Sequence, residues 1–267
     1  ISGIADYKFP SEKECLDQVK KIMGKLGHPT KAGFDRITAI APKRPATDIY
    51  SLLPEGGGKT YDMREIIACI TDASEFDEFK ADYGKSILCG YARIEGWAVG
   101  IVANQRLIVK NKKGEMQMGG VIYNDSADKS ARFILNCNQK KIPLIFLQDV
   151  TGFMVGSRSE HTGIIKDGAK MVNAVANSVV PKITIIIGNS FGAGNYAMCG
   201  KAYDPRFIYA WPTAKIAVMG GDQAAKTMLQ IQVAGMKARG LTVAPEDEQK
   251  LLDDIKGRYE KQTSPYY

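Results

Sequence analysis

The stretch PKITIIIGNSFGAGNYAMCG, residues 181–200, decides how this fold is organised. An apolar run ends at Gly188, further glycines follow at Gly192 and Gly194, and a helix-like stretch begins there. A strand that passes through a glycine-rich turn into a helix usually brings backbone N–H groups close to a ligand, because glycine has no side chain to hold it away. The same pattern also describes a tight packing corner without a ligand, and the local sequence leaves both interpretations open.

Strands and helices alternate on both sides of this turn, from residue 86 onward. A hairpin is expected over 86–104, with its turn at Glu95–Gly96. The other expected strands are 142–149, 181–188 and two short ones around Pro212 within 206–221. The expected helices cover 11–27, 63–70, 76–84, 124–141, 162–178, 222–240 and 245–262, and 150–161 is expected to be a glycine-rich loop. This alternation predicts an α/β fold whose sheet is largely parallel after the hairpin.

The bulk composition is that of an ordinary globular protein. With 45% hydrophobic and 24% charged residues, the 267-residue chain can bury a sizeable core, and no apolar run is long enough to span a membrane. The net charge of +7 is spread along the chain, and KNKKGE (110–115) is the one tight cluster. Because no nucleic-acid-binding motif accompanies these cations, no nucleic acid partner is expected.

The cysteines and histidines argue against disulfides and against a metal site. Five cysteines occur, an odd number, and no two of them have the spacing of metal ligands. We therefore expect reduced thiols and a cytoplasmic protein, or one of the mitochondrial matrix if the source is eukaryotic. Only His28 and His161 are present, so a zinc site is not expected.

Two glycine motifs resemble nucleotide-binding sequences and are incomplete. GGGKT (56–60) lacks the first glycine of a phosphate-binding loop, because Leu53 occupies that position, and we interpret it as part of a flexible linker over 28–60. GAGNYAMCG would need a glycine at position 197 to be a dinucleotide fingerprint, and Ala197 stands there.

A third motif, GNSFG (188–192), matches the G-x-S-x-G of serine hydrolases. That mechanism also needs a histidine base later in the chain, and none follows Ser190. What remains is the backbone itself. The N–H groups at the start of a helix carry positive partial charge and would stabilise an enolate or a urea-type oxyanion without any side chain.

Three longer stretches resemble the β subunits of biotin-dependent acyl-CoA carboxyltransferases. They are YDMREIIACITDASEFDEFKADYG (61–84), LIFLQDVTGFMVG (144–156) and the stretch from GIIKDGAK to AVMGG (163–221). The resemblance covers most of residues 60–235. Within it, GAGNYAMCGKAYDPRF (192–207) is most similar to the methylcrotonyl-CoA and geranyl-CoA branch.

The resemblance implies a crotonase-like (ClpP/crotonase) fold of repeated ββα units. Such subunits have two homologous halves, and this chain resembles the second half. Residues 1–60 are then expected to be the end of the N-terminal half and a linker, and 61–267 the C-terminal, biotin-side domain, stopping before its closing helices. We expect the chain to be part of a subunit about twice as long. Residues 110–125 form a longer and more polar segment than the family's usual loop.

The resemblance also implies an activity and its partners. The family transfers CO2 from carboxybiotin, held on a carrier protein, to the enolate of an acyl-CoA, here 3-methylcrotonyl-CoA or a related one. No protein base is needed, which agrees with the missing histidine. The implied partners are a biotin carboxylase and biotin carrier subunit, together with further copies in a homo-oligomer built from dimers, a hexamer. The oxyanion hole for the thioester is implied to lie in the first half.

By position in the motif, the backbone N–H groups of Ala193 and Gly194 would hold the urea oxygen of biotin. Tyr196 stands where the family tunes its choice of acyl group. The residues implied to line the biotin slot are Phe153, Met154 and Gly156. For the side chains of Tyr196, Phe153 and Met154, ordinary packing is the alternative.

Three other functions stay open. A biotin-dependent decarboxylase subunit would share these motifs. A crotonase-like hydratase or isomerase would need a carboxylate base, for which Glu160 is the candidate near the glycine-rich loops. A non-catalytic scaffold would have no need of an intact GAGNY turn.

Overall fold

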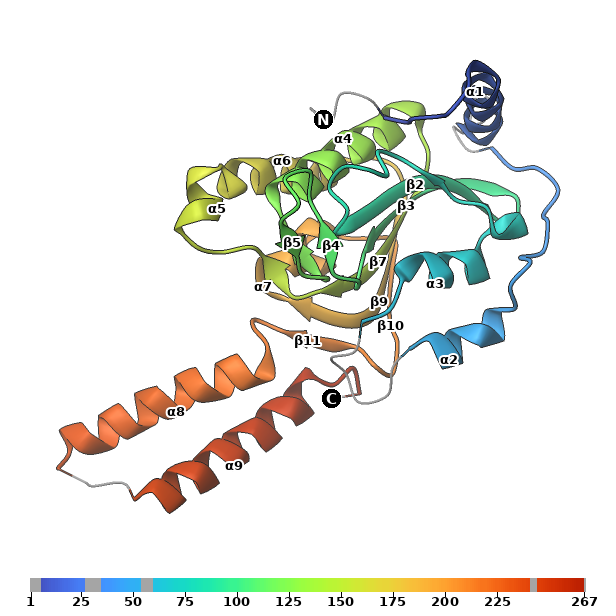
Figure 1. Ribbon diagram of the computed structural model, residues 1–267. Helices are drawn as coiled ribbons and strands as arrows, with labels where there is room; N and C mark the ends of the chain where they lie inside the picture. Colours follow the sequence, from blue (N-terminus) through green and yellow to red (C-terminus); the bar gives the residue numbers. More distant parts are fainter. Residues whose placement is uncertain (1–5, 27–34, 54–59, 241–243, 267) are drawn as a thin grey trace.

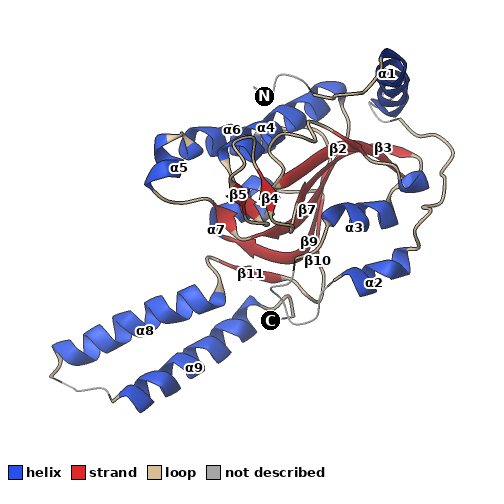
Figure 2. Ribbon diagram, viewed as in Figure 1, coloured by secondary structure: helices blue, strands red, loops and turns tan. Residues whose placement is uncertain are grey.

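A seven-stranded sheet between layers of helices forms the body of the computed structural model (Figures 1 and 2). The structure describes residues 6–26, 35–53, 60–240 and 244–266. The strands lie in the order β1-β2-β3-β7-β9-β10, and β11 pairs with the C-terminal part of β9. The predicted α/β fold is therefore confirmed.

An antiparallel hairpin lies next to the edge of the sheet. β2 (Ile87–Ile94) and β3 (Trp97–Asn104) pair along their whole length. Glu95 and Gly96, the two turn residues, have φ angles of 51° and 79°, as expected of the turns that join two right-twisted strands. The hairpin predicted over 86–104 is confirmed.

The strands that follow the hairpin pair in parallel, as predicted, whereas the two-residue edge strand β1 (Asp77–Glu78) pairs antiparallel with β2. β7 (Leu144–Val150) lies between β3 and β9 (Lys182–Phe191), and β10 (Phe207–Ala210) and β11 (Lys215–Ala217) follow along the far edge of β9. Every residue of β7 is buried, which explains its nearly continuous apolar sequence, because a central parallel strand is covered on both faces.

Two apolar cores lie on opposite faces of the sheet. On one face, α4 (Asn124–Lys140) and α6 (Ile164–Ala176) pack over a core that includes Phe133 and Phe146. On the other face, α3 (Met63–Ile70) covers the second core. These two layers fix the sheet whose strand ends carry the glycine-rich turns.

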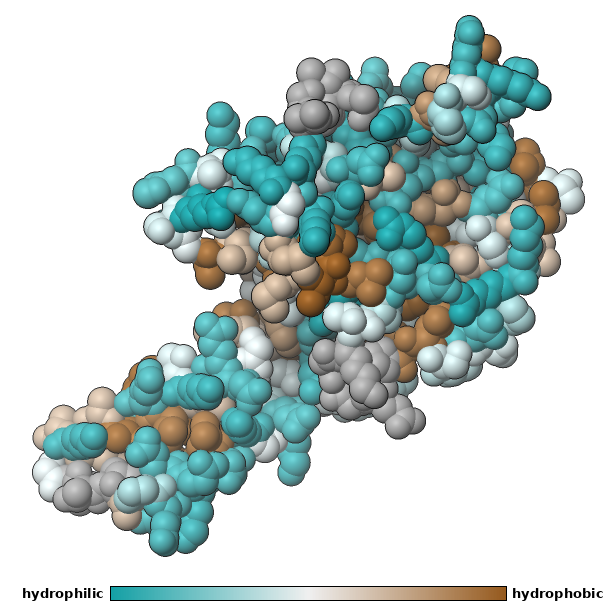
Figure 3. All heavy atoms as spheres, viewed as in Figure 1, coloured by the Kyte–Doolittle hydropathy of each residue, from teal (hydrophilic) through white to brown (hydrophobic). Residues whose placement is uncertain are grey.

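The helix pair α8 (Gly221–Ala238) and α9 (Pro245–Thr263) extends away from the sheet (Figure 1). Its helices have a small core of their own, formed by Ala225, Leu229, Val233 and Ile255. Figure 3 shows apolar side chains gathered along the seam between them. No helix among the described residues is long and apolar enough to cross a membrane.

The remaining elements are one further long helix, α1, and several short segments. They are α1 (Glu12–Leu26), η1 (Ala46–Asp48), α2 (Ile49–Leu52), η2 (Asp72–Ser74), β1 (Asp77–Glu78), β4 (Val109–Lys110), β5 (Met116–Gln117), β6 (Val121–Ile122), β8 (Gly152–Phe153), α5 (Ser157–His161), α7 (Gly192–Ala197) and η3 (Lys201–Tyr203). The polar segment 110–125 therefore contains part of a small β4–β5 hairpin and the strand β6.

The helix predicted over 76–84 is wrong. The segment forms the edge strand β1 and then a series of turns. Phe76 and Phe79 have helical spacing in the sequence, but Phe76 packs against one core and Phe79 belongs to the other. An extended chain beside β2 places them on opposite faces of the sheet, which a helix could not do.

Smaller differences concern loops and ends. The predicted loop 150–161 contains β8 and the short helix α5, and β9 continues to Phe191, three residues beyond the predicted strand. In the linker predicted over 28–60, residues 46–52 form short helical turns. Most of GGGKT, up to residue 59, lies outside the described residues.

Gly100 tests how closely α4 approaches the sheet. A Cβ atom added at Gly100 would lie 2.6 Å from Cys137 Sγ and 3.2 Å from Phe133 Cε1, both on α4. We expect Gly100→Ala to lower the free energy of unfolding by about 1–3 kcal/mol, because α4 must move outward. Urea denaturation measures the change. Gly235→Ala is the control: nothing lies within 4 Å of its Cβ position on α8, so it should stabilise the helix by about 0.5–1 kcal/mol. Equal effects of the two changes would contradict this packing.

Candidate functional site

The two glycine-rich segments meet beyond the C-terminal ends of β7 and β9. In parallel sheets this edge is where ligands bind. β9 leads directly into α7, and β7 leads into β8. A Cβ atom at Gly194 on α7 would lie 2.6 Å from Val150 Cγ2 and 3.2 Å from the Cα atom of Gly152. The missing side chain at Gly194 therefore allows α7 to lie directly against the end of β7 and the start of β8.

The first turn of α7 is open to solvent on one side. Ala193 is exposed, whereas Gly194 is buried against β8. The first N–H groups of a helix have no acceptor within that helix. Gly192 has a φ angle of 53°, a left-handed conformation that glycine adopts readily. Tyr196 is 48% exposed and lies edge-on to Tyr203, with ring centroids 6.2 Å apart.

The other three predicted site residues have different surroundings. The ring of Phe153 packs against Gly168 of α6, where a Cβ atom would lie 2.8 Å from its edge, and it joins the core on that face. Met154 is 38% exposed, and its N–H donates to the carbonyl of Ile122 at 2.8 Å. Gly156 is exposed, precedes α5, and has a φ angle of 115°. Phe153 thus anchors β8 against α6, whereas Met154 and Gly156 are exposed to solvent.

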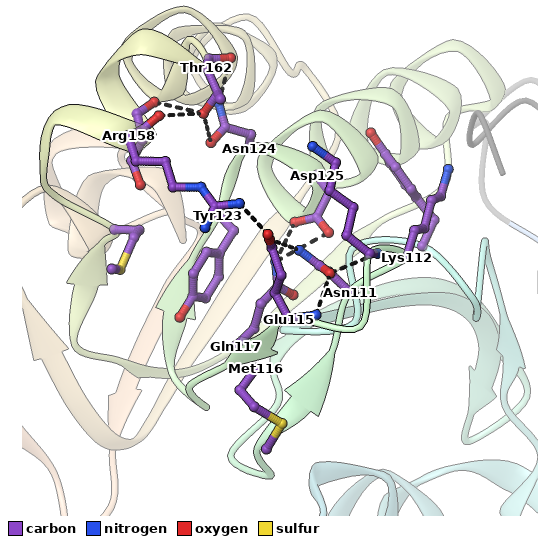
Figure 4. Close-up of a pocket in the computed structure, with 14 residues that line it drawn as sticks. Asn111, Lys112, Glu115, Met116, Gln117, Tyr123, Asn124, Asp125, Arg158 and Thr162 are labelled. Atoms are coloured by element: carbon purple, nitrogen blue, oxygen red, sulfur yellow. Dashed lines mark hydrogen bonds and ion pairs between the residues drawn. The ribbon is translucent and has the colours of Figure 1, made fainter.

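A cavity of about 360 Å³ lies beside Met154, between the β4–β5 hairpin, the start of α4 and α5 (Figure 4). Asn111 braces the hairpin turn, and its amide donates to Glu115 at 2.8 Å. Glu115 in turn forms an ion pair with Arg158 of α5, and the two side chains point toward each other in Figure 4. The described lining includes Met154 but no residue of α7, so the cavity adjoins one part of the predicted site only.

A bulge in β9 redirects the strand just before α7. β7 advances two residues between the pairs Gln148–Ile186 and Val150–Ser190, whereas β9 advances four. Such bulges re-aim a strand end and are common beside active sites. The carboxylate of Asp149 lies within this bulge.

Asp149 is 5% exposed and its carboxylate is fully engaged. Oδ1 accepts the N–H of Asn189 at 2.8 Å, Oδ2 accepts the hydroxyl of Tyr61 at 2.9 Å, and Arg106 Nε lies 3.2 Å from Oδ2. Burial, followed by the charge of Asp149, raises the pKa of Tyr61, so its hydroxyl remains a donor. A Cβ atom at Gly188 would lie 2.5 Å from the carboxylate carbon of Asp149, which explains the glycine there.

The side-chain nucleophiles near the turn are not activated. Ser190 has no exposed surface, and its hydroxyl donates to Gln148 Oε1 at 2.6 Å. Burial raises the pKa of the Cys199 thiol to about 11, so it stays protonated near neutral pH. Glu160, the candidate base of a hydratase, is exposed on α5. Within the described part of the chain, no three His, Cys, Asp or Glu side chains gather as metal ligands.

Asp149, Arg106 and Gln148 were missed by reasoning from the sequence. One signal was available: Gln148 and Asp149 are polar residues at the end of the apolar run IPLIFLQD (142–149). Their partners lie about 40 or more positions away in the chain, and local spacing does not reveal such contacts.

Comparisons with known proteins show which proteins this chain is similar to. The sequence profile of the carboxyl transferase domain matches residues 1–267. The chain is 43% identical to the mitochondrial methylcrotonoyl-CoA carboxylase beta chain of Dictyostelium discoideum, over all of this chain and 43% of that protein. Among solved structures, the beta subunit of Pseudomonas aeruginosa (P. aeruginosa) geranyl-CoA carboxylase has a TM-score of 0.73 at 37% identity, covering 100% of this chain and 48% of that one.

A second solved structure is the transcarboxylase 12S subunit, described as a hexamer with hydrolysed methylmalonyl-coenzyme A bound. It has a TM-score of 0.76 at 31% identity and covers 94% of this chain and 45% of that one. These neighbours are carboxyltransferases, so the crotonase-like fold implied by the sequence is confirmed. The chain spans less than half the length of each of these relatives.

The buried carboxylate in the bulge can be tested by removing its charge. We expect Asp149→Asn to lower the free energy of unfolding by about 3 kcal/mol, because the largely buried Arg106 loses its counter-charge. Thermal or urea denaturation measures it. The control is Asp128→Asn, whose partner Lys170 lies 3.1 Å away on the surface, where the change should cost less than about 1 kcal/mol. If Asp149→Asn is as mild as its control, the carboxylate does not hold the bulge.

Proposed function

This chain belongs to the carboxyl transferase domain family, and from that premise we propose that it forms the biotin-side domain of a biotin-dependent acyl-CoA carboxylase β subunit. Its reaction is the transfer of CO2 from carboxybiotin to an acyl-CoA, 3-methylcrotonyl-CoA or a related substrate. The observation that carries the proposal is the direct contact of Gly194 with Gly152 and Val150. That contact brings together the two glycine-rich segments at the ligand-binding edge of a parallel sheet.

The residues present suit a compact, uncharged ring system such as that of biotin. Nothing lies within 4 Å of the positions where Cβ atoms would stand at Gly152 and Gly156. Ala193, next to the buried Gly194, is exposed and carries only a methyl group. A bicyclic ring could therefore approach the backbone at these points, whereas larger side chains would keep it away.

When bound, carboxybiotin would supply both the CO2 and the base that takes the α-proton of the acyl-CoA. The N–H groups of Ala193 and Gly194 would donate to the urea oxygen of the bound ring and stabilise negative charge on it. Because they are backbone donors at the start of a helix, they are already oriented before the reaction begins. No side-chain base is required of this chain, in keeping with the fully hydrogen-bonded Ser190.

The side chains around the turn then shape the site. Tyr196, half exposed on α7, bounds the acyl group of the substrate. Met154 and Gly156 line the biotin slot, and Phe153 contributes to it from the core side. Residues 61–267 form this domain, and 1–60 belong to the end of the preceding half and a linker.

The proposed partners are a biotin carboxylase and biotin carrier subunit and further copies of the same subunit, arranged as dimers in a hexamer. The hexamer described for the transcarboxylase 12S structure supports the assembly. The proposed compartment is the cytoplasm, or the mitochondrial matrix in a eukaryote. All five cysteines are free thiols, and the Dictyostelium relative is named as mitochondrial.

The direct test supplies the complete protein and its biotin-carrying partner with a panel of acyl-CoA esters. We expect biotin-dependent incorporation of labelled bicarbonate into 3-methylcrotonyl-CoA or a related ester. Hydration of an acyl-CoA without biotin would favour the hydratase, and CO2 release from a carboxylated ester without the forward reaction would favour the decarboxylase. Either result would contradict the proposal.

Ala193 provides a cleaner test of the backbone donors than Gly194, because a side chain at Gly194 would collide with Val150. We expect Ala193→Val to fold normally and to lose carboxyl transfer about 100-fold, because the branched side chain would keep the urea oxygen away from a backbone N–H that the substitution itself leaves in place. Ala193→Ser is the control, since its small side chain should leave most of the activity. The steady-state rate of carboxyl transfer is measured for both variants. A normal rate in the folded Ala193→Val protein would mean that the turn is a packing corner only.

Tyr196 tests the choice of acyl group. We expect Tyr196→Ala to change the ratio of kcat/KM between short and branched acyl-CoA esters by about tenfold, because a substrate-facing wall is removed. Tyr209→Ala on β10, where the tyrosine is 54% exposed, serves as the control and should leave the ratio unchanged. If Tyr196→Ala, like its control, leaves this ratio of kcat/KM values unchanged, Tyr196 does not bound the acyl group.

A further inference from the structure

Ser190 lies in a network of buried hydrogen bonds to which the proposed function gives no role. Its hydroxyl donates to Gln148 Oε1 at 2.6 Å and accepts from Asn195 Nδ2 at 2.7 Å. Gln148 Nε2 then donates to the carbonyl of Met198 at 2.6 Å. These hydrogen bonds connect the ends of β7 and β9 with Asn195 in α7 and with Met198, the residue after α7.

We propose that Gln148, Ser190 and Asn195 form a hydrogen-bond relay that holds α7 in one orientation, so that Ser190 is a positioning residue for the backbone donors of the turn. This inference rests on the proposed function and deepens it. The serine of the G-x-S-x-G motif has no nucleophilic role here: its single proton is used in the bond to Gln148, and its oxygen accepts from Asn195.

The direction of each bond in the relay follows from the donors available. Because Ser190 has one proton and gives it to Gln148, its oxygen must be the acceptor for Asn195. The amide of Gln148 has its oxygen toward Ser190, which leaves its N–H for the carbonyl of Met198, the residue that follows α7. Fully satisfied buried networks of this kind favour one arrangement of the elements they join.

A close contact restrains Asn195 on its other side. The side-chain oxygen of Asn195 occupies the space where a Cβ atom of Gly200 would be, so only glycine fits at that position. The N–H of Gly200 also donates to the backbone carbonyl of Asn195 at 2.8 Å. Asn195 is thus held by Ser190 through its side chain and by Gly200 through its backbone, and rotation of α7 about its axis would break both contacts.

α7 needs this restraint because it is only six residues long. A helix of that length has little stability of its own. Without the relay, the turn would sample orientations in which the N–H groups of Ala193 and Gly194 no longer converge on one point. Loss of the relay should therefore reduce turnover more than it reduces binding of the acyl-CoA.

The experiment uses the complete protein with its biotin-carrying partner and the variants Ser190→Ala and Asn195→Ala. The matched control is Ser130→Ala on α4, which removes another buried serine hydroxyl, bonded to the carbonyl of Ser126 at 2.7 Å. Hydrogen–deuterium exchange of the peptide covering 191–198 reports on α7 independently of activity. We expect this exchange to be about tenfold faster in both relay variants, corresponding to one lost hydrogen bond, and unchanged in the control.

In the same variants we expect kcat to fall about tenfold, with the KM for acyl-CoA within twofold of normal. The double variant should resemble either single one, because the residues act as a unit.

Unchanged exchange over 191–198 would overturn the relay, and so would equal losses in kcat and stability for Ser130→Ala. Labelling of Ser190 by a fluorophosphonate would identify a nucleophile and also overturn it. If the normal protein transfers no carboxyl group, the proposed function fails, and the exchange measurement still decides the relay. Asn195→Ala preserves the test if Ser190→Ala does not fold, since Asn195 is only half-buried.

Discussion

The carboxylate of Asp149 determines where β9 can bend, and the geometry of the turn depends on that bend. Two strands that pair in parallel would normally stay in register. Between the pairs Gln148–Ile186 and Val150–Ser190, however, β9 contains two more residues than β7. The extra backbone requires an acceptor inside the protein, and Asp149 provides it through the N–H of Asn189. Arg106 balances the buried charge, and the hydroxyl of Tyr61 occupies the second oxygen. The next residue, Ser190, then faces Gln148, and α7 begins two positions later.

Hydrophobic pattern made the central architecture predictable. The hairpin, α4 and the buried strand β7 each have a strong local signal, and the turn at Glu95–Gly96 has the residues that its backbone needs. The segment 76–84 shows where this reasoning fails. Phe76 and Phe79 are three residues apart, as on one face of a helix, but pairing with β2 imposes an extended chain and sends them to different cores. Tertiary pairing overrode a local pattern of nine residues.

The candidate site was predictable in part. Glycines at 188, 192 and 194 revealed the turn because backbone close approach excludes side chains, and the structure gives each a definite neighbour. The polar residues that hold the turn were not predictable, since Gln148 and Ser190 are 42 positions apart. The G-x-S-x-G pattern even points to the wrong chemistry. The serine hydroxyl donates one hydrogen bond and accepts another there. These properties suit a structural junction as well as they suit a nucleophile.

Under the proposed function, the turn therefore combines two opposite requirements. Its donors must be exposed to a ligand, which removes the packing that would normally fix a short helix, as the exposed Ala193 and half-exposed Tyr196 illustrate. Its orientation must nevertheless be defined before a ligand arrives, because donors that reorganise during the reaction stabilise charge poorly. Buried polar contacts on the far side resolve the conflict: they hold α7 through Gln148, Ser190 and Asn195 without covering its first turn. This division explains why buried polar groups, costly elsewhere in a core, lie directly behind the glycine-rich turn.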